Sequence, residues 1–406
     1  MISDPNDVRE NNLRMVLDMI REAGTISRVD IARAAQLSRS TITNVVNELL
    51  PTDLIHESGT VSSVVGRRPI LLEFNYDARA LLGVDMGASH LTVVAMNLGG
   101  RVLAIRRESF PVLTNPDQSI AEIQRLLREV QAEAGYDQEK TWGIGIAVPS
   151  PLEGEKLDRL SPIIMSHWIG VDLKREIRAA MRLPVFVDND ANMGALAEKW
   201  WGHGREVHNL AFIKVATGVG CGLIINDTIY RGEGGTAGEI GHTSIDVNGP
   251  LCRCGLRGCL EAMTGVPAIL AAVQAELDNG RPSLLAGKAV TVADVVAAAR
   301  AGDPMPIEVI QRAGRYLGLA IANLLNLVNP GLIVLGGSVT EAGDMLLSPL
   351  RQTVRERSFA KSNAEATITM SRLGEDAVAV GAATLVIQQL LHVPGMPILQ
   401  VIGGKM

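Results

Sequence analysis

The chain has 406 residues, which is enough for two or three domains that each bury a core. Its hydrophobic content of 47% and charged content of 20% are ordinary for a globular protein. A formal net charge of −6 excludes a broadly basic nucleic-acid coat, but it does not exclude a local DNA-reading element. No apolar run reaches membrane-spanning length without interruption, and the polar, acidic N-terminus is unlike a secretory signal. We therefore expect a cytoplasmic protein without membrane insertion.

The N-terminal region has the pattern of a helix-turn-helix. Residues 11–23 place apolar side chains at helical spacing, and two short helices joined by a tight turn follow within residues 26–50. Ser27 can cap the first helix of this pair, and Ser38 can cap the second. In a helix-turn-helix, the second helix enters the major groove of DNA.

The start of that second helix carries small polar side chains, which suit base edges and phosphates. The predicted DNA-contacting residues there are Ser38, Arg39, Ser40, Thr41, Thr43 and Asn44. Two strands near residues 55–57 and 70–74 then flank a loop with Arg67 and Arg68, which resembles a wing that reaches a phosphate or a narrow minor groove. Residues 1–80 hold nine arginines, no lysines and eleven acids, so a helical protein-interaction module remains an alternative.

From residue 81 onward the chain alternates between apolar strands and amphipathic helices, which predicts α/β architecture. Acids lie at strand ends, where α/β proteins place binding groups: Asp85 ends the first strand, and residues 188–190 follow the strand at 185–187. The alternating glycines of residues 217–222 leave room for a phosphate, or they serve only a tight hairpin. The remaining predicted elements are helices at 116–134, 193–201, 262–276, 292–300, 307–328, 345–355 and 378–391, and strands at 143–148, 210–216, 331–335 and 366–370.

Three of the four cysteines lie in the stretch from Glu239 to Glu261. The spacing C-x-C-x₄-C with an upstream histidine offers the Cys₃His ligand set of a closed structural zinc site. The predicted ligands of this zinc ion (Zn2+) are His242, Cys252, Cys254 and Cys259. The alternative is three unrelated buried thiols. Clustered thiols without a signal peptide favour metal binding in a reducing cytoplasm over disulfides. A metal that folds this loop would also position the two acids at its ends.

These motifs together resemble the ROK family (repressors, open reading frames and sugar kinases). The segments DMGAS, VDNDAN, ATGVGCG, EIGH and CxCGxxGCxE occur in the family's order over about residues 80–390. With its helix-turn-helix, the chain resembles the ROK transcriptional repressors that respond to xylose, glucose or N-acetylglucosamine. The resemblance implies a winged helix-turn-helix over residues 1–78, followed over 79–390 by two actin-like α/β lobes with a sugar cleft and a zinc loop. We assign no role to residues 391–406.

The resemblance also implies a set of ligands and partners. Five residues match the family's sugar contacts, and their carboxylate, amide and imidazole groups suit ring hydroxyls. These residues are Asn189, Asp190, Glu239, His242 and Glu261. A helix cap at Asp190 and a loop-end salt bridge at Glu239 are the structural alternatives. The implied partners are operator DNA, a small-molecule sugar effector and a second copy in a homodimer or a dimer of dimers. A regulatory protein partner is also compatible with the family.

An ATP-dependent sugar kinase with an added DNA-binding domain is the alternative function. In that case Asp190 would be the catalytic base and Asp85 would organise magnesium. The segment at residues 85–90 departs from the D-x-G-G-T-K pattern of ROK kinases, however. Ala88 adds a Cβ where a glycine would admit a phosphate, and His90 supplies less positive charge than a lysine. We therefore expect a sugar-responsive regulator and not an enzyme. Which sugar it binds, and which operator, do not follow from the sequence.

Overall fold

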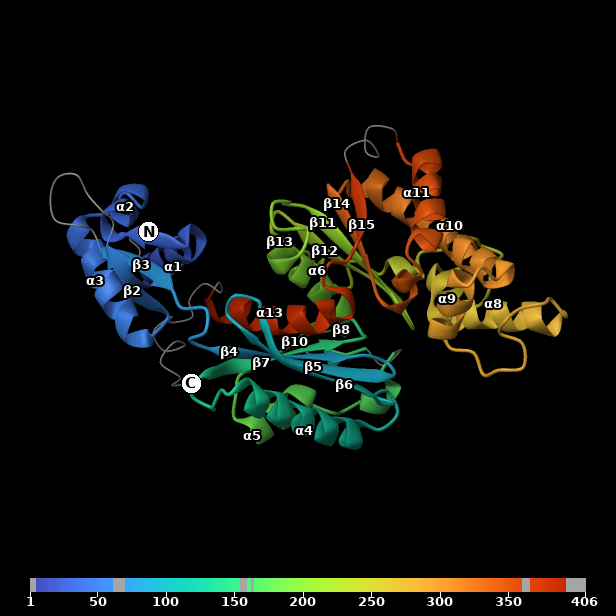
Figure 1. The fold of residues 1–406 in the computed structure, drawn as a ribbon, viewed down its shortest axis with the longest axis horizontal. Coiled ribbons are helices and arrows are strands. Elements are labelled where there is room, and N and C mark those ends of the chain that lie inside the picture. The colour runs from blue at the N-terminus through green and yellow to red at the C-terminus, as the bar shows by residue number, and fades with distance from the viewer. Residues whose placement is uncertain (1–4, 61–69, 154–158, 162–163, 360–365, 392–406) are drawn as a thin grey trace.

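The computed structural model describes residues 5–60, 70–153, 159–161, 164–359 and 366–391. Figure 1 shows three parts, namely a small N-terminal unit and two larger α/β lobes. Because the chain alternates strand and helix periodicities after residue 80, each lobe forms a sheet covered by helices. The predicted fold class, a winged helix followed by two α/β lobes, is confirmed.

The N-terminal unit is a winged helix. Its elements are α1 (Pro5–Ala23), β1 (Thr25–Ser27), α2 (Arg28–Ala34), α3 (Arg39–Leu49), β2 (Ile55–Thr60) and β3 (Ile70–Phe74). Both predicted caps form, because the Ser27 side chain accepts a hydrogen bond from Asp30 N and that of Ser38 accepts one from Thr41 N. The short strand β1 was not predicted; it pairs with β3 and completes a sheet of order β1-β3-β2.

The first lobe is built on a five-stranded sheet of order β10-β7-β4-β5-β6. Helices α4 and α5 pack on one face of this sheet, and α13 lies along the other (Figure 1). The elements are β4 (Ala80–Met86), β5 (His90–Asn97), β6 (Val102–Ser109), α4 (Pro116–Ala134), β7 (Thr141–Val148), α5 (Leu173–Met181), β10 (Val185–Asn189) and α13 (Ala377–Leu391). Helix α5 was missed, although Leu173, Ile177 and Met181 recur every fourth residue and are buried.

The second lobe repeats this sheet topology with the order β13-β12-β11-β14-β15. In both sheets an antiparallel meander of three strands is extended on one side by two parallel strands. Its strands are β11 (Leu210–Val215), β12 (Val219–Ile225), β13 (Thr228–Ile229), β14 (Leu332–Gly336) and β15 (Thr367–Met370). Its helices are α7 (Glu261–Thr264), α8 (Val266–Asp278), α9 (Val292–Arg300), α10 (Pro304–Leu327) and α11 (Asp344–Arg357).

The single helix predicted at 262–276 is wrong in one respect, because it divides into α7 and α8. Gly265 between them has extended backbone angles, φ −65° and ψ 158°, and so interrupts the helix. Val266 N donates to Ala216 O, 2.8 Å away, which ties the break to the end of β11. A tertiary contact therefore overrides the helical periodicity of this segment.

Helix α6 (Asp190–Trp201) and α13 pack against each other at the centre of the molecule. Glycines permit this approach: a Cβ on Gly381 would lie 1.8 Å from Met193 O. Likewise, a Cβ on Gly145 would lie 1.7 Å from Ala382 O, where α13 meets β7. Backbone-to-backbone contact leaves little room for sliding, so α13 is fixed against both α6 and β7.

Within the described ranges, no helix combines the length and apolar character that crossing a membrane requires.

Candidate functional site

A cavity that is partly open to solvent is lined by both lobes. Its walls come from the β4–β5 loop, the carboxyl ends of β7 and β10, the β11–β12 hairpin and the segment around the cysteines. All five predicted sugar-contacting residues line it, namely Asn189, Asp190, Glu239, His242 and Glu261. Because the strands of the first lobe end here, side chains that are far apart in sequence converge on one space.

Asn189 is the N-cap of α6, and Asp190 is the first residue of that helix. The Asn189 Oδ1 atom accepts hydrogen bonds from Ala191 N at 2.9 Å and Asn192 N at 3.3 Å. Its Nδ2 atom donates to Ser150 O at 3.3 Å. Capping thus occupies the Asn189 oxygen, whereas the Asp190 carboxylate is not used as a cap and faces the cavity.

Lys214, on β11, donates a hydrogen bond from Nζ to Asp190 Oδ2 at 2.8 Å. Both side chains are largely buried, with exposed fractions of 10% for Lys214 and 13% for Asp190. Burial by itself lowers the pKa of Lys214, but attraction by Asp190 and Asp85 outweighs it and raises that pKa above its ordinary value. Sequence reasoning missed Lys214, although a lysine inside the apolar strand LAFIKV signals a buried charge that needs a partner.

Asp85, at the end of β4, is a second carboxylate close to the Lys214 ammonium group. Its Oδ2 atom is 3.2 Å from His90 Nε2, and its Oδ1 atom is 3.9 Å from Lys214 Nζ. The Oδ1 atom is buried and accepts no hydrogen bond from the described residues. Burial opposes ionisation, yet Lys214 and then His90 lower the pKa of Asp85 below its usual value. The aspartate is therefore an ionised, buried group.

Glu261 is held by Arg253, which lies between Cys252 and Cys254 in the sequence. Arg253 donates from Nε to Oε1 at 2.7 Å and from Nη2 to Oε2 at 3.1 Å. Val219 N also donates to Glu261 Oε2, at 3.0 Å. The two parallel hydrogen bonds from the Arg253 guanidinium fix the plane of the Glu261 carboxylate. Arg253 was missed because its pairing depends on how the cysteine loop folds.

Glu239 lies just before a short 3-10 helix and lines the same cavity. Burial, and then the charges of Asp190 and Glu261, raise the pKa of Glu239, while Arg253 opposes the rise. In the described part of the chain, neither lysine nor arginine forms a salt bridge with it, and its Oε2 atom is 3.9 Å from His242 Nε2. The loop-end salt bridge considered from the sequence is thus reduced, in that part, to this contact with His242, and three acids face one cavity.

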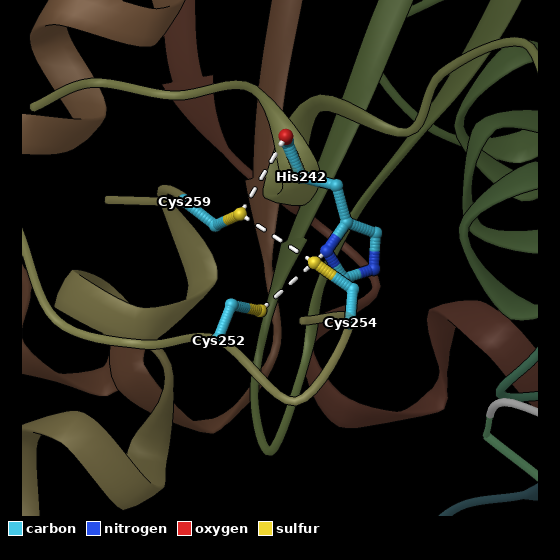
Figure 2. A group of neighbouring side chains, drawn as sticks. All are labelled: His242, Cys252, Cys254 and Cys259. Atoms are coloured by element: carbon cyan, nitrogen blue, oxygen red, sulfur yellow. Dashed lines mark hydrogen bonds between the residues drawn. The ribbon is translucent and has the colours of Figure 1, made fainter. Parts of the chain in front are cut away.

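The histidine and the three cysteines form one compact group that can hold a metal ion, and their ligand atoms all lie within 4.8 Å of one another. Figure 2 shows the sulfurs and the imidazole pointing toward a common centre. The Cys254 and Cys259 sulfurs are 3.7 Å apart, as are Cys252 Sγ and His242 Nδ1. A tetrahedral zinc ion with Zn–S bonds of about 2.3 Å separates its sulfurs by about 3.8 Å, so the donor set fits.

The fourth cysteine, Cys221, is separate from this group. It lies on β12, and burial raises its pKa to about 12, which keeps the thiol protonated. The metal-binding group therefore consists of His242 and the three loop cysteines, and Cys221 is not part of it.

The glycines of residues 217–222 form the tight β11–β12 hairpin, in which Val215 pairs with Val219. A Cβ on Gly222 would lie 2.1 Å from Ala191 O, and one on Gly218 would lie 2.8 Å from Glu261. The protein itself therefore fills the space beside Gly218 and Gly222, whereas Gly218 and Gly220 still line the cavity. The structure shows the tight hairpin, and a phosphate at this loop stays a prediction.

On the winged helix, Arg39, Ser40, Thr43 and Asn44 are exposed at the start of α3. Ser38 is exposed too, but its hydroxyl bonds to Ser40 and Thr41, and Thr43 donates to Arg39 O. Asn47, which sequence reasoning did not select, is also exposed on this helix. The predicted wing arginines, Arg67 and Arg68, lie outside the described residues.

The chain thus combines a winged helix with two lobes that share a sheet topology and that line a cavity together. This is the architecture of a transcriptional regulator built on a sugar-kinase-like fold. The sequence profile of the ROK family matches residues 81–389, and the chain belongs to that family. A putative xylose repressor from Caldicellulosiruptor sp. (strain Rt8B.4) is 32% identical over 95% of this chain and 98% of its own length.

Two solved structures are similar as well. A ROK family transcriptional regulator, a homologue of the E. coli MLC protein, superposes with a TM-score of 0.82 at 32% identity, over 98% of this chain and 100% of its own. A ROK family glucokinase from Streptomyces griseus, in complex with glucose and AMPPNP, superposes with a TM-score of 0.69 at 28% identity, over 76% of this chain and 99% of its own. The regulator thus matches nearly the whole of this chain, whereas the kinase matches only part of it.

Proposed function

We propose that this protein is a sugar-responsive transcriptional repressor of carbohydrate uptake or breakdown genes. The winged helix would bind operator DNA, and the cavity between the lobes would bind the sugar. The observation that carries the proposal is the presence, in one chain, of a DNA-binding unit and a cavity lined by Asp190, Glu239 and Glu261. Similarity over 95% of the chain to a putative xylose repressor supports it. Such a repressor acts in the cytoplasm, where the DNA is.

In this proposal a structural zinc ion occupies the Cys₃His group. When bound, it would hold the loop from Cys252 to Cys259 in one conformation. His242 would bind zinc through Nδ1, which leaves Nε2–H free to donate to a sugar hydroxyl. Arg253, set between two ligands, would then orient Glu261 toward the sugar. Asn189 would offer its remaining amide hydrogen.

The protein would act as a homodimer, or as a dimer of dimers, with two winged helices on a near-palindromic operator. Sugar binding changes DNA binding only if the sugar binds the two conformations with different affinity. The exposed side chains of Arg39, Ser40 and Asn44 would read the bases, while Arg67 and Arg68 would contact phosphates or the minor groove.

The test is operator affinity, measured by fluorescence anisotropy with xylose, glucose, N-acetylglucosamine and their phosphates. One sugar should change the affinity of the wild type by about tenfold or more, within the usual range of allosteric coupling. Asp190→Asn should bind the same operator but respond to no sugar. A wild-type affinity that stays constant across the whole panel contradicts a sugar sensor and points to a protein effector.

Kinase activity is the alternative, and the glucokinase similarity motivates a direct assay for it. Purified protein with ATP, magnesium and each sugar should release no more ADP than Asp190→Asn does. Sugar-dependent turnover in the wild type alone would show that the cleft still transfers phosphate.

A further inference from the structure

Lys214 stands where two cavities meet. Its side chain lines the cavity described above and also a second cavity, which Asp85, Gly337 and Ser338 line as well. Lys214 belongs to a strand of the second lobe, whereas Asp85 ends a strand of the first lobe. The ammonium group therefore lies between the lobes, 2.8 Å from Asp190 Oδ2 and 3.9 Å from Asp85 Oδ1.

The sheet around Lys214 provides room for its side chain. Its cross-strand neighbours are Gly220 on β12 and Gly336 on β14, neither of which has a side chain beside the lysine stem. A long side chain on this strand can therefore extend along the sheet surface to the strand ends. The two glycines thus lie on the strands to either side of the one charged residue in β11.

The two carboxylates that flank this ammonium need a positive charge. Asp85 and Asp190 have side-chain exposed fractions of 3% and 13%, and two buried acids without a cation would repel each other. The Asp85 Oδ1 atom has no hydrogen-bond partner among the described residues, so its stabilisation comes from the charge of Lys214 and from His90 on the other oxygen. In many proteins a hydrated magnesium ion satisfies such a pair of acids.

We propose that Lys214 is a tethered cation that takes the place of a divalent metal ion between Asp85 and Asp190. The cleft then binds its ligand without a metal and does not phosphorylate it. This inference rests on the proposed function, because it explains why a cleft of this shape senses a sugar and does not transform it.

The chemistry follows from the positions of the atoms. Phosphoryl transfer needs metal ions that bridge the phosphates and a carboxylate free to accept the hydroxyl proton. The ammonium group already donates to Asp190 Oδ2, so one of the two oxygens of this carboxylate is engaged by the protein itself. A divalent cation that approaches Asp85 would meet a fixed positive charge 3.9 Å from its first ligand atom. The lysine therefore opposes a metal ion at Asp85 and engages one oxygen of Asp190.

The test is Mn2+ binding, measured by electron paramagnetic resonance on zinc-loaded protein. Lys214→Met keeps a stem of similar length and removes the charge, while Lys214→Arg keeps the charge and serves as the matched control. Lys214→Met should gain one Mn2+ site at least about tenfold tighter than any in the wild type, because a buried like charge has been removed. Adding Asp85→Asn to Lys214→Met should abolish that site, and Lys214→Arg should not create it.

Lys214→Gln provides a second variant if Lys214→Met does not fold, since the amide can still donate to Asp190. Zinc content and operator affinity report folding independently of Mn2+. A wild type that binds Mn2+ through Asp85 as tightly as the variants do would overturn the inference, and so would folded Met and Gln variants that both gain no site. If the wild type fails to bind operator or to respond to sugar, the proposed function fails, whereas the Mn2+ result still decides the role of Lys214.

Discussion

Arg253 joins the metal-binding loop to the ligand cavity through one side chain. It follows Cys252 directly, and it forms two hydrogen bonds with Glu261. The carboxylate is nearly buried, with a side-chain exposed fraction of 9%. A buried carboxylate that loses its guanidinium partner is left with an uncompensated charge. Removing Arg253 should therefore cost more free energy than breaking a surface ion pair.

At this residue scale we predict that Arg253→Ala weakens sugar binding and leaves zinc content unchanged. Loss of a charge-assisted hydrogen-bond pair should cost about 1.5–3 kcal/mol, or roughly tenfold or more in sugar affinity, by calorimetry. Arg257→Ala is the matched control, because this arginine lies on the same loop but, among the described residues, donates only to the backbone of Gly249 at 3.4 Å. Equal losses for both variants would refute a specific role for Arg253.

Replacement of a predicted metal ligand tests whether the metal positions Arg253. Cys254→Ala should lose the zinc, as elemental analysis would show, because its sulfur lies 3.7 Å from Cys259 Sγ at the shared centre. The sugar affinity should fall with it, since Arg253 is then no longer positioned. Cys221→Ala, outside the group, should retain a full zinc content; zinc loss there, or retention in Cys254→Ala, contradicts the ligand set.

At the scale of elements, α10 depends on its N-terminal cap. Asp303 is buried and accepts hydrogen bonds from Ser283 Oγ at 2.6 Å, Leu284 N at 2.7 Å and Met305 N at 3.2 Å. Burial opposes ionisation of Asp303, but these hydrogen bonds outweigh it and lower its pKa below the ordinary value. One carboxylate therefore starts a helix of 24 residues and ties the preceding loop to it.

We predict that Asp303→Ala lowers the free energy of unfolding by about 1–2 kcal/mol at neutral pH. Because the folded-state pKa of Asp303 is depressed, its contribution is present above the unfolded-state pKa of about 3.9 and is lost as pH falls through the folded pKa. Urea unfolding of both proteins at several pH values should show the difference shrinking below about pH 4. A difference that does not change with pH would show that the carboxylate charge is not what caps the helix.

Helix α3 presents the side chains that would read DNA. Asn44 is exposed on it, and its amide can donate to and accept from an adenine edge. We predict that Asn44→Ala reduces discrimination between operator and random DNA by about 1–3 kcal/mol while the affinity for random DNA stays the same. Competition binding measures the affinity for both DNAs, and the random DNA serves as the control. An equal loss of affinity for both would show that Asn44 contacts the phosphate backbone and not a base.

At the scale of the whole molecule, α6 connects the cavity to the winged helix. It begins at Asn189 and Asp190 and ends about 18 Å away at Trp200 and Trp201. The Trp200 ring lies 5.2 Å from the guanidinium carbon of Arg21 on α1. Buried apolar residues of the winged helix, the first sheet and α13 form one continuous cluster there. A change at the cavity can therefore reach the DNA-binding unit through a helix that does not bend easily.

We predict that Trp200→Ala uncouples the two sites. Sugar affinity should change by less than about twofold, while the effect of the sugar on operator affinity should fall by about 0.5–2 kcal/mol. Trp200→Phe, which keeps an aromatic face for Arg21, should retain most of the coupling. An unchanged response of operator binding to sugar in Trp200→Ala would exclude α6 as the route.

Much of this molecule follows from local patterns in the sequence. The caps at Ser27 and Ser38, the buried helix faces and the Cys₃His group each depend on residues close together in the chain, so their spacing carries the information. The break at Gly265 and the short strand β1 depend on contacts with distant segments, and spacing does not encode them.

The sequence by itself determined most of the helices and strands, the grouping of His242 with three cysteines, and the acids of the cavity. Only the tertiary structure decided which cation each acid meets. Lys214 and Asp190 are 24 residues apart, and Lys214 and Asp85 belong to different lobes, so no periodicity relates them. The physical reason is that a buried charge needs a partner of opposite sign, but its identity depends on which strand ends the packed lobes bring together. That packing places a lysine between two aspartates, in a cleft whose motifs resemble those of a kinase.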